Sequence, residues 1–170
     1  NPLNYKRQNE IKEKHSLCIL EDAACSIGSE YDGMRVGNLA DISVFSLHSR
    51  KFITTGEGGM VTTNTVQWAE WMNSYKHFGI GHNDTGLGAH FERVGTNYKL
   101  SDIQAAVGLV QMQHIDSLLT RRDQLARNYC ALLNDTPEVT FPGFTPKGTN
   151  SWQSFCIYVK NRDKIIQKLK

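Results

Sequence analysis

Two short apolar runs, each followed at once by polar residues, constrain the fold more than any other feature of this sequence. Residues 17–20 are apolar and precede Glu21 and Asp22, and residues 42–47 are rich in β-formers and precede the polar stretch 48–51. Short runs of this kind are typical of buried strands whose carboxyl ends emerge at a polar site. We therefore expect two buried strands that deliver candidate functional residues to their ends.

Other patterns predict further strands and several helices. Ser101 and Gln104 have the spacing of a capping box at the start of a long helical pattern. That pattern continues to Asn134, so it predicts two helices, or one kinked helix that joins two domains. Gly79 is expected at the C′ position of a preceding helix, and residues 79–97 form a long loop. The predicted helices are 5–15, 66–78, 103–134 and one from residue 162, and the further strands are 59–63 and 155–159.

The chain is expected to contain parts of two domains. A boundary falls between about residues 120 and 140, which gives a first unit at 1–125 and a second at 126–170. The chain opens directly before a helical stretch and ends in a lysine-rich helical pattern. Both ends are therefore expected to be cut from a longer protein.

Composition excludes several classes of protein. With 39% hydrophobic and 21% charged residues the chain is an ordinary globular one, and its net charge of +2 comes from scattered basic residues, so we expect no nucleic-acid partner. No apolar run approaches the ~20 residues of a membrane helix, and because residues 1–16 contain no apolar run we expect no signal peptide. The cysteines are too far apart for a zinc knuckle, so we expect no metal and reduced thiols in a cytoplasmic protein. They are Cys18, Cys25, Cys130 and Cys156.

Lys51 and Asp22 are the residues that follow the two strands and can carry chemistry. A lysine here can be a solvated surface charge, but the small and glycine residues after it let backbone approach a ligand, and a desolvated lysine is an amine nucleophile. Asp22 can cap a helix, or, as a carboxylate buried at the end of a strand, it can hold a pyridine ring nitrogen protonated. The glycines at 56–59 lack the Gly-Lys-Ser/Thr ending of a phosphate-binding P-loop, which excludes nucleotide hydrolysis.

Four segments together resemble the DegT/DnrJ/EryC1/StrS family of pyridoxal-phosphate (PLP)-dependent sugar aminotransferases. They are ILEDAA at 19–24, FSLHSRK at 45–51, TTGEGGM at 54–60 and GTNYKLSDIQAA at 95–106. The resemblance implies an α/β fold, namely part of an aspartate aminotransferase-like (fold-type I) large domain with the beginning of an α+β small domain. It also implies pyridoxal 5′-phosphate as the cofactor.

The resemblance implies a role for each matching residue. Lys51 would form the internal aldimine and move the proton, and Asp22 would hold the pyridine nitrogen. Ser46 would hydrogen-bond the cofactor phosphate, and Asn97 would reach the phosphate in the neighbouring subunit, which implies a homodimer. Cys25 stands where the family often has Gln or His near the cofactor's 3′-oxygen, and a thiol is a weaker hydrogen-bond partner.

The implied reaction is ping-pong transfer of an amino group from an amino acid, with glutamate the expected donor, to a nucleotide-linked keto sugar. Relatives that act as dehydrases have histidine in place of the lysine, so Lys51 favours transamination. The resemblance implies that the family's phosphate-gripping turn would lie before Asn1, outside this sequence. The alternative is therefore a catalytically inactive, truncated fragment that serves only as a folding or dimerisation unit.

Overall fold

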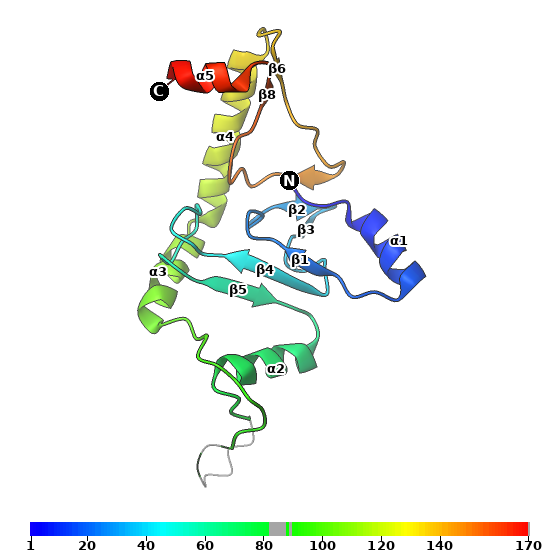
Figure 1. The fold of residues 1–170 in the computed structure, drawn as a ribbon, viewed down its shortest axis with the longest axis vertical. Helices are drawn as coiled ribbons and strands as arrows, with labels where there is room; N and C mark the ends of the chain where they lie inside the picture. The colour runs from blue at the N-terminus through cyan, green and yellow to red at the C-terminus, as the bar shows by residue number, and fades with distance from the viewer. Residues whose placement is uncertain (82–87, 89, 170) are drawn as a thin grey trace.

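A small mixed sheet lies at the centre of the molecule, whose computed structural model describes residues 1–81, 88 and 90–169 (Figure 1). Its strands are β1 (Leu20–Asp22), β4 (Ile42–Ser46) and β5 (Gly59–Thr62), in the order β1-β4-β5. Strands β1 and β4 are parallel, whereas β4 and β5 are antiparallel. The two predicted strands that precede polar residues are therefore neighbours, and their carboxyl ends lie at the same edge.

The first strand begins later than the sequence pattern predicts. Helix α1 (Tyr5–His15) ends with Ser16 in the left-handed region, and the Leu17 amide donates to the Lys12 carbonyl at 3.0 Å. This bond belongs to a Schellman helix end, so the start of the apolar run closes the helix instead of extending the sheet. The strand then runs from Leu20 through the acidic pair.

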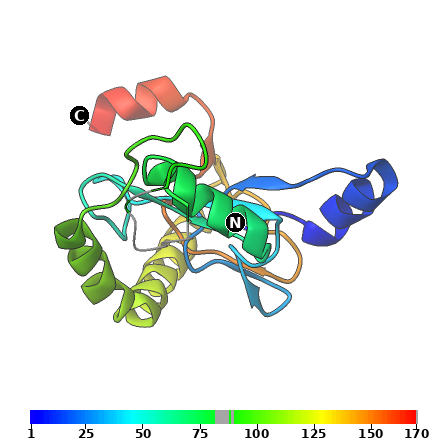
Figure 2. The same ribbon diagram turned by 90° about the horizontal axis from the view of Figure 1, so that it is seen from below.

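Helix α1 packs its first residue into the core beside the sheet. Tyr5 is 2% exposed and clusters with three other buried residues, Ala23, Val36 and Phe45. Figures 1 and 2 show α1 and α3 on opposite sides of the central sheet.

A second small sheet brings the late part of the chain back to the early part. Strands β2 (Glu30–Tyr31) and β3 (Met34–Arg35) form a hairpin, and β7 (Gly148–Thr149) pairs with β2 in the order β3-β2-β7. Asp32 and Gly33 both have positive φ, as the tight turn of such a hairpin requires. Residues on the two sides of the predicted domain boundary therefore share one sheet.

Helix α2 (Val66–Lys76) is shorter than predicted, and Gly79 is not its C′ residue. The cap is His77, and Phe78 follows it with a φ of 59°. Gly79 instead lies against the Arg93 carbonyl, since a Cβ there would come within 1.8 Å of that oxygen. Residues 82–87 and 89 of the predicted 79–97 loop lie outside the described residues.

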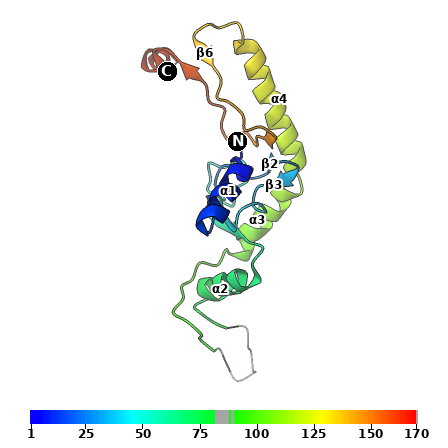
Figure 3. The same cartoon turned by 90° about the vertical axis from the view of Figure 1, so that its right-hand side faces the viewer.

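The long helical pattern forms two helices, α3 (Asp102–Met112) and α4 (Ile115–Leu133). The predicted capping box is present, because Ser101 accepts from the Gln104 amide and the Gln104 side chain accepts from the Ser101 amide. Helix α4 rises away from the central sheet, and β6 (Val139–Thr140), β8 (Tyr158–Val159) and α5 (Arg162–Leu169) gather at its far end (Figure 3). Strand β8 covers only the last two residues of the predicted strand 155–159. No helix among the described residues could cross a membrane.

Candidate active site

Lys51 lies on the connection between β4 and β5, residues 47–58, whose two ends meet because Ser46 pairs with Gly59. The Lys51 amide donates to the His48 carbonyl at 2.9 Å, so the chain turns tightly at the lysine. The lysine is half-buried. Its position is consequently set by a loop that is closed at its base.

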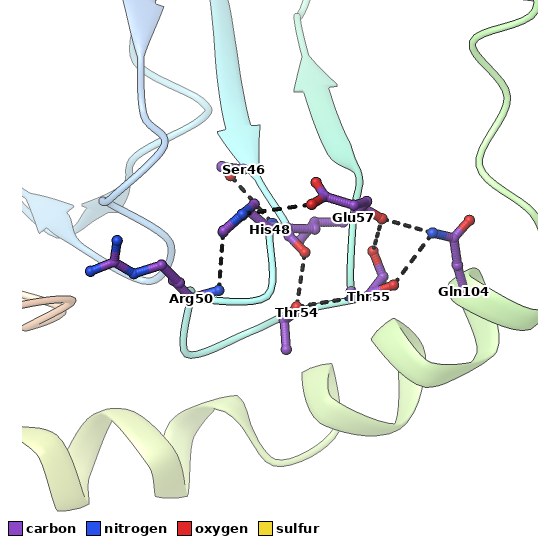
Figure 4. Close-up of polar contacts among 9 residues, drawn as sticks. Ser46, His48, Arg50, Thr54, Thr55, Glu57 and Gln104 are labelled. Carbon is purple, nitrogen blue, oxygen red and sulfur yellow. Dashed lines mark hydrogen bonds and ion pairs between the residues drawn. The ribbon is translucent and has the colours of Figure 1, made fainter.

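Helix α3 holds this loop from one side with two glutamine side chains. The Gln104 Nε2 donates to the carbonyls of Glu57, at 2.9 Å, and Thr55, at 3.4 Å. Gln111 accepts from the Thr54 amide at 3.0 Å and donates to the Thr54 carbonyl at 2.6 Å. Figure 4 shows Gln104 reaching from α3 to the loop. Because backbone groups are bonded, the contact fixes the course of the loop itself.

His48 organises the part of the loop that directly precedes the lysine. Its Nδ1 accepts from the Arg50 amide at 3.1 Å, and its own amide donates to the Ser46 Oγ at 3.3 Å. Its Nε2 lies 3.6 Å from a carboxylate oxygen of Glu57 on the other arm of the loop (Figure 4). These contacts give His48 a local structural role.

Three of the predicted site residues line one small hollow, which leaves no room for a water molecule. It is lined by Lys51, Ser46 and Cys25, together with Gln153 and neighbouring backbone. The Lys51 Nζ donates to the Cys25 Sγ at 3.0 Å. The amine and the thiol are therefore close enough to contact the same ligand atom.

Asp22 stands at the carboxyl end of β1 with one oxygen accepting from the Ala24 amide at 3.0 Å. Its side chain is exposed, contrary to the expectation of a buried carboxylate. Side chains alternate across a strand, so the preceding residue, Glu21, points into the core instead and is 4% exposed. No helix follows directly, which removes the helix-capping interpretation of Asp22.

Glu21 is a buried carboxylate that the sequence did not single out. It accepts from the Tyr5 hydroxyl and, at 2.8 Å, from the Ser43 Oγ. Burial, followed by the bond to Glu21, raises the pKa of Tyr5 well above its usual value. This network ties α1, β1 and β4 together directly behind Asp22.

Asn97 lies away from this hollow, beside the end of α2, where it bridges to His77. The side chain is exposed, and its Oδ1 accepts from the Lys99 Nζ at 2.8 Å. Lys99 also lies 4.1 Å above the Phe78 ring. The amide oxygen is thus occupied, and the Asn97 NH₂ group is the end presented for another acceptor.

Metal ligands do not gather in the described ranges, where no group of three His, Cys, Asp or Glu side chains could hold an ion. Sequence reasoning predicted Lys51, Ser46, Cys25 and Asp22 as site residues but did not single out the glutamines that fix the loop. Gln104 was expected only as part of a capping box. Glutamines that bond a distant backbone have no characteristic spacing, so no sequence signal would have revealed them.

Comparison with known proteins places the chain in a family. It is 39% identical over 120 residues to GDP-perosamine synthase of Caulobacter vibrioides, covering 71% of this chain and 32% of that protein. It is 38% identical over 131 residues to UDP-4-amino-4,6-dideoxy-N-acetyl-beta-L-altrosamine transaminase of Helicobacter pylori, covering 77% and 35%. The chain thus spans about a third of the length of these curated relatives.

The same relationship holds for the fold. The structure of S. venezuelae DesV in complex with a ketimine intermediate matches 99% of this chain and 44% of its own, with a TM-score of 0.88 and 29% identity. The α/β architecture is therefore that of a PLP-dependent aminotransferase. The model of the DegT/DnrJ/EryC1/StrS aminotransferase family matches residues 1–170, and the chain belongs to that family.

Proposed function

We propose that the protein carrying this sequence transfers an amino group from an amino acid, with glutamate as the donor, to a nucleotide-linked keto sugar. The observation that supports this most is Lys51, whose amine donates to the Cys25 thiol at 3.0 Å from a loop that is bonded to α3. The two curated relatives, a GDP-perosamine synthase and a UDP-sugar transaminase, support the nucleotide-sugar substrate.

The residues present fit pyridoxal phosphate, the cofactor of this family. Among described residues only one oxygen of Asp22 accepts a hydrogen bond, so its other oxygen can accept from a protonated ring nitrogen. The Ser46 hydroxyl at the end of β4 can donate to a phosphate. When bound, the cofactor acts as an electron sink that makes the Cα–H of an amino-acid substrate acidic.

The chain's own groups would then have separate tasks. The Lys51 Nζ would attach the cofactor covalently and, once released, would move the proton between the substrate carbon and the cofactor. Asp22 would keep the ring nitrogen protonated through a charge-assisted hydrogen bond. Cys25 would contribute the thiol next to the Lys51 amine, as the cofactor-binding residue in place of the Gln or His often found there.

Asn97 supports a homodimer in which each subunit contributes to its neighbour's site. The residue does not line the hollow of its own chain, and Lys99 leaves its NH₂ group for an outside acceptor. A phosphate held by Asn97 of the other subunit would also face the positive charge of Lys99. We further propose that residues 1–125 belong to the large domain, that 126–170 begin the small one, and that the enzyme acts in the cytoplasm.

The lysine assignment is tested by reducing the PLP-treated protein with borohydride and mapping the label by mass spectrometry. We expect the label on Lys51, and we expect Lys51→Ala to lose both the visible absorbance of the attached cofactor and turnover. Lys6→Ala, a change at an exposed lysine on α1, serves as the control and should keep both. Retained absorbance and turnover in Lys51→Ala would refute the assignment.

The dimer is tested by mixing subunits that carry Lys51→Ala with subunits that carry Asn97→Ala. If Asn97 serves the neighbouring site, the mixed dimer contains one site with both residues intact, so cofactor binding and activity should return. If Asn97 serves its own site, every site in the mixture lacks one residue and the mixture should stay as poor as its parents.

The alternative, a chain that only folds and associates, draws on the apolar residues that α3 exposes. Ile103 is 81% exposed and Val110 is 58% exposed, which is unusual on a helix that covers a sheet. Analytical ultracentrifugation with and without PLP separates the two functions. Association with no label on Lys51 would favour the alternative.

A further inference from the structure

Gln153 bonds the backbone on both sides of Lys51. Its Oε1 accepts from the Phe52 amide at 3.2 Å, and its Nε2 donates to the Arg50 carbonyl at 3.0 Å. One side-chain amide thus engages the residue before the lysine and the residue after it. Gln153 comes from the segment that follows β7, far along the chain from the β4–β5 connection.

Arg122 of α4 holds Gln153 in this place. Its guanidinium donates to the Gln153 carbonyl at 3.1 Å and to the Trp152 carbonyl at 2.8 Å. The same guanidinium lies 4.9 Å from the centre of the Phe52 ring, which belongs to the bonded loop. Arg122 therefore contacts both the glutamine and the loop that the glutamine bonds.

Residues 151–153, the segment that contains Gln153, also fix the backbone that carries Cys25. The Ser151 Oγ donates to the Cys25 carbonyl at 3.3 Å, and the buried Ser151 amide donates to the Ser29 Oγ at 3.1 Å. Residues 151–153 consequently hold the backbone at both of the side chains, amine and thiol, that lie 3.0 Å apart.

Two separate parts of the molecule hold the backbone of the β4–β5 connection, helix α3 and the segment after β7. Gln111 on α3 bonds both backbone groups of Thr54, and Gln153 bonds the two neighbours of Lys51. With these groups engaged, the lysine backbone cannot rotate without breaking a hydrogen bond. The direction of the Lys51 side chain depends on that backbone.

We propose that Gln153 is a positioning residue for Lys51, held by Arg122, and that it sets the rate at which Lys51 takes up the cofactor. This inference rests on the proposed function, since it assumes that the lysine amine is the attachment point. Gln153 acts through the loop and needs no contact with substrate. Its effect is a property of the segment after α4, which the sequence places outside the first predicted domain.

The test compares Gln153→Leu with the unaltered full-length protein and with Gln167→Leu, a change at an exposed position of α5. In Gln153→Leu we expect at least a tenfold slower appearance of the visible absorbance on adding PLP. We also expect at least tenfold faster hydrogen exchange at the Phe52 amide, with the far-UV circular dichroism unchanged. Gln153→Glu keeps the acceptor for the Phe52 amide but loses the donor to the Arg50 carbonyl, so its rates of cofactor uptake and of hydrogen exchange should lie between those of Gln153→Leu and the unaltered protein. Gln167→Leu should match the unaltered protein.

The two readouts separate the possible failures. Faster exchange at Phe52 without slower cofactor uptake would overturn the positioning role and leave the proposed function standing. Unchanged cofactor uptake together with unchanged exchange at the Phe52 amide would also overturn the positioning role and leave the proposed function standing. If the unaltered protein takes up no PLP on Lys51, the proposed function fails and this inference fails with it. Equal slowing in Gln167→Leu would show a general effect and would also overturn the inference.

Discussion

Removing the Tyr5 hydroxyl is the sharpest test of how the core behind Asp22 is held. Tyr5→Phe keeps the buried ring but removes the donor to Glu21, a carboxylate that is 4% exposed. A hydrogen bond to a charged group contributes about 1.5–3 kcal/mol. We therefore expect a loss of about 2 kcal/mol in the free energy of unfolding, roughly a 30-fold change in the equilibrium constant.

Tyr31→Phe is the matched control for this change. The two rings pack together with their centres 5.4 Å apart, but the Tyr31 hydroxyl donates only to the exposed Asn4 side chain at 3.3 Å. Its loss should cost less than about 0.5 kcal/mol. Urea unfolding followed by tryptophan fluorescence measures both variants. If Tyr5→Phe costs no more than Tyr31→Phe, the buried network does not hold the core.

The same tyrosine predicts a dependence on alkaline pH. Burial and the bond to Glu21 raise the pKa of Tyr5 in the folded protein above its unfolded value of about 10. The folded state thus binds the hydroxyl proton more tightly, so this stabilisation is complete below about pH 10 and is lost as the pH rises further. We expect stability to fall above about pH 10, and to fall less in Tyr5→Phe.

Two further changes test the glycine and acid-pH arguments. Gly79→Ala should lower the free energy of unfolding by more than about 4 kcal/mol or prevent folding, because a Cβ would meet the Arg93 carbonyl. Gly33 has the same φ of 80° but open space around it, so Gly33→Ala should lower the free energy of unfolding by only about 1–2 kcal/mol. Thermal unfolding measures both, and equal costs would refute the steric argument. Hydrogen bonds from the Ile19 amide and then from Lys12 lower the pKa of the Asp41 carboxyl group. The stabilisation that this carboxylate contributes is therefore present above about pH 4 and lost as the pH falls below that. Asp41→Asn should lower stability at pH 7 and flatten its fall in acid, as acid titration of unfolding will show.

Local sequence signals predicted the elements whose causes are local. The Ser101–Gln104 capping box needs only four consecutive residues, and it begins α3 as expected. Strand β4 follows its β-rich run closely, ending at Ser46. The strand end predicted Lys51, and the family resemblance added Ser46 and Cys25; in the structure these three side chains line one small hollow.

Features that depend on distant partners were not predictable in the same way. The acidic residues at 21–22 form strand although the apolar run predicted only a strand before them, because Glu21 finds its partners in α1 and β4. The hairpin at 30–35 was missed since its strands are two residues long and gain stability from β7. Gln153 carries no local signal at all. Its importance follows from contacts made more than 100 positions away.

Helix α4 has a mechanical consequence for the site. With 19 residues it is about 28 Å long, and it starts at the buried Ile115, with β6, β8 and α5 near its far end. A tilt of about 10° about Ile115 would move Leu133 by about 5 Å but Arg122 by only about 2 Å. A tilt of α4 therefore converts a large displacement at Leu133 into a small displacement at Arg122. A shift of that size is enough to lengthen the hydrogen bond from Arg122 to Gln153, which in turn bonds both neighbours of Lys51.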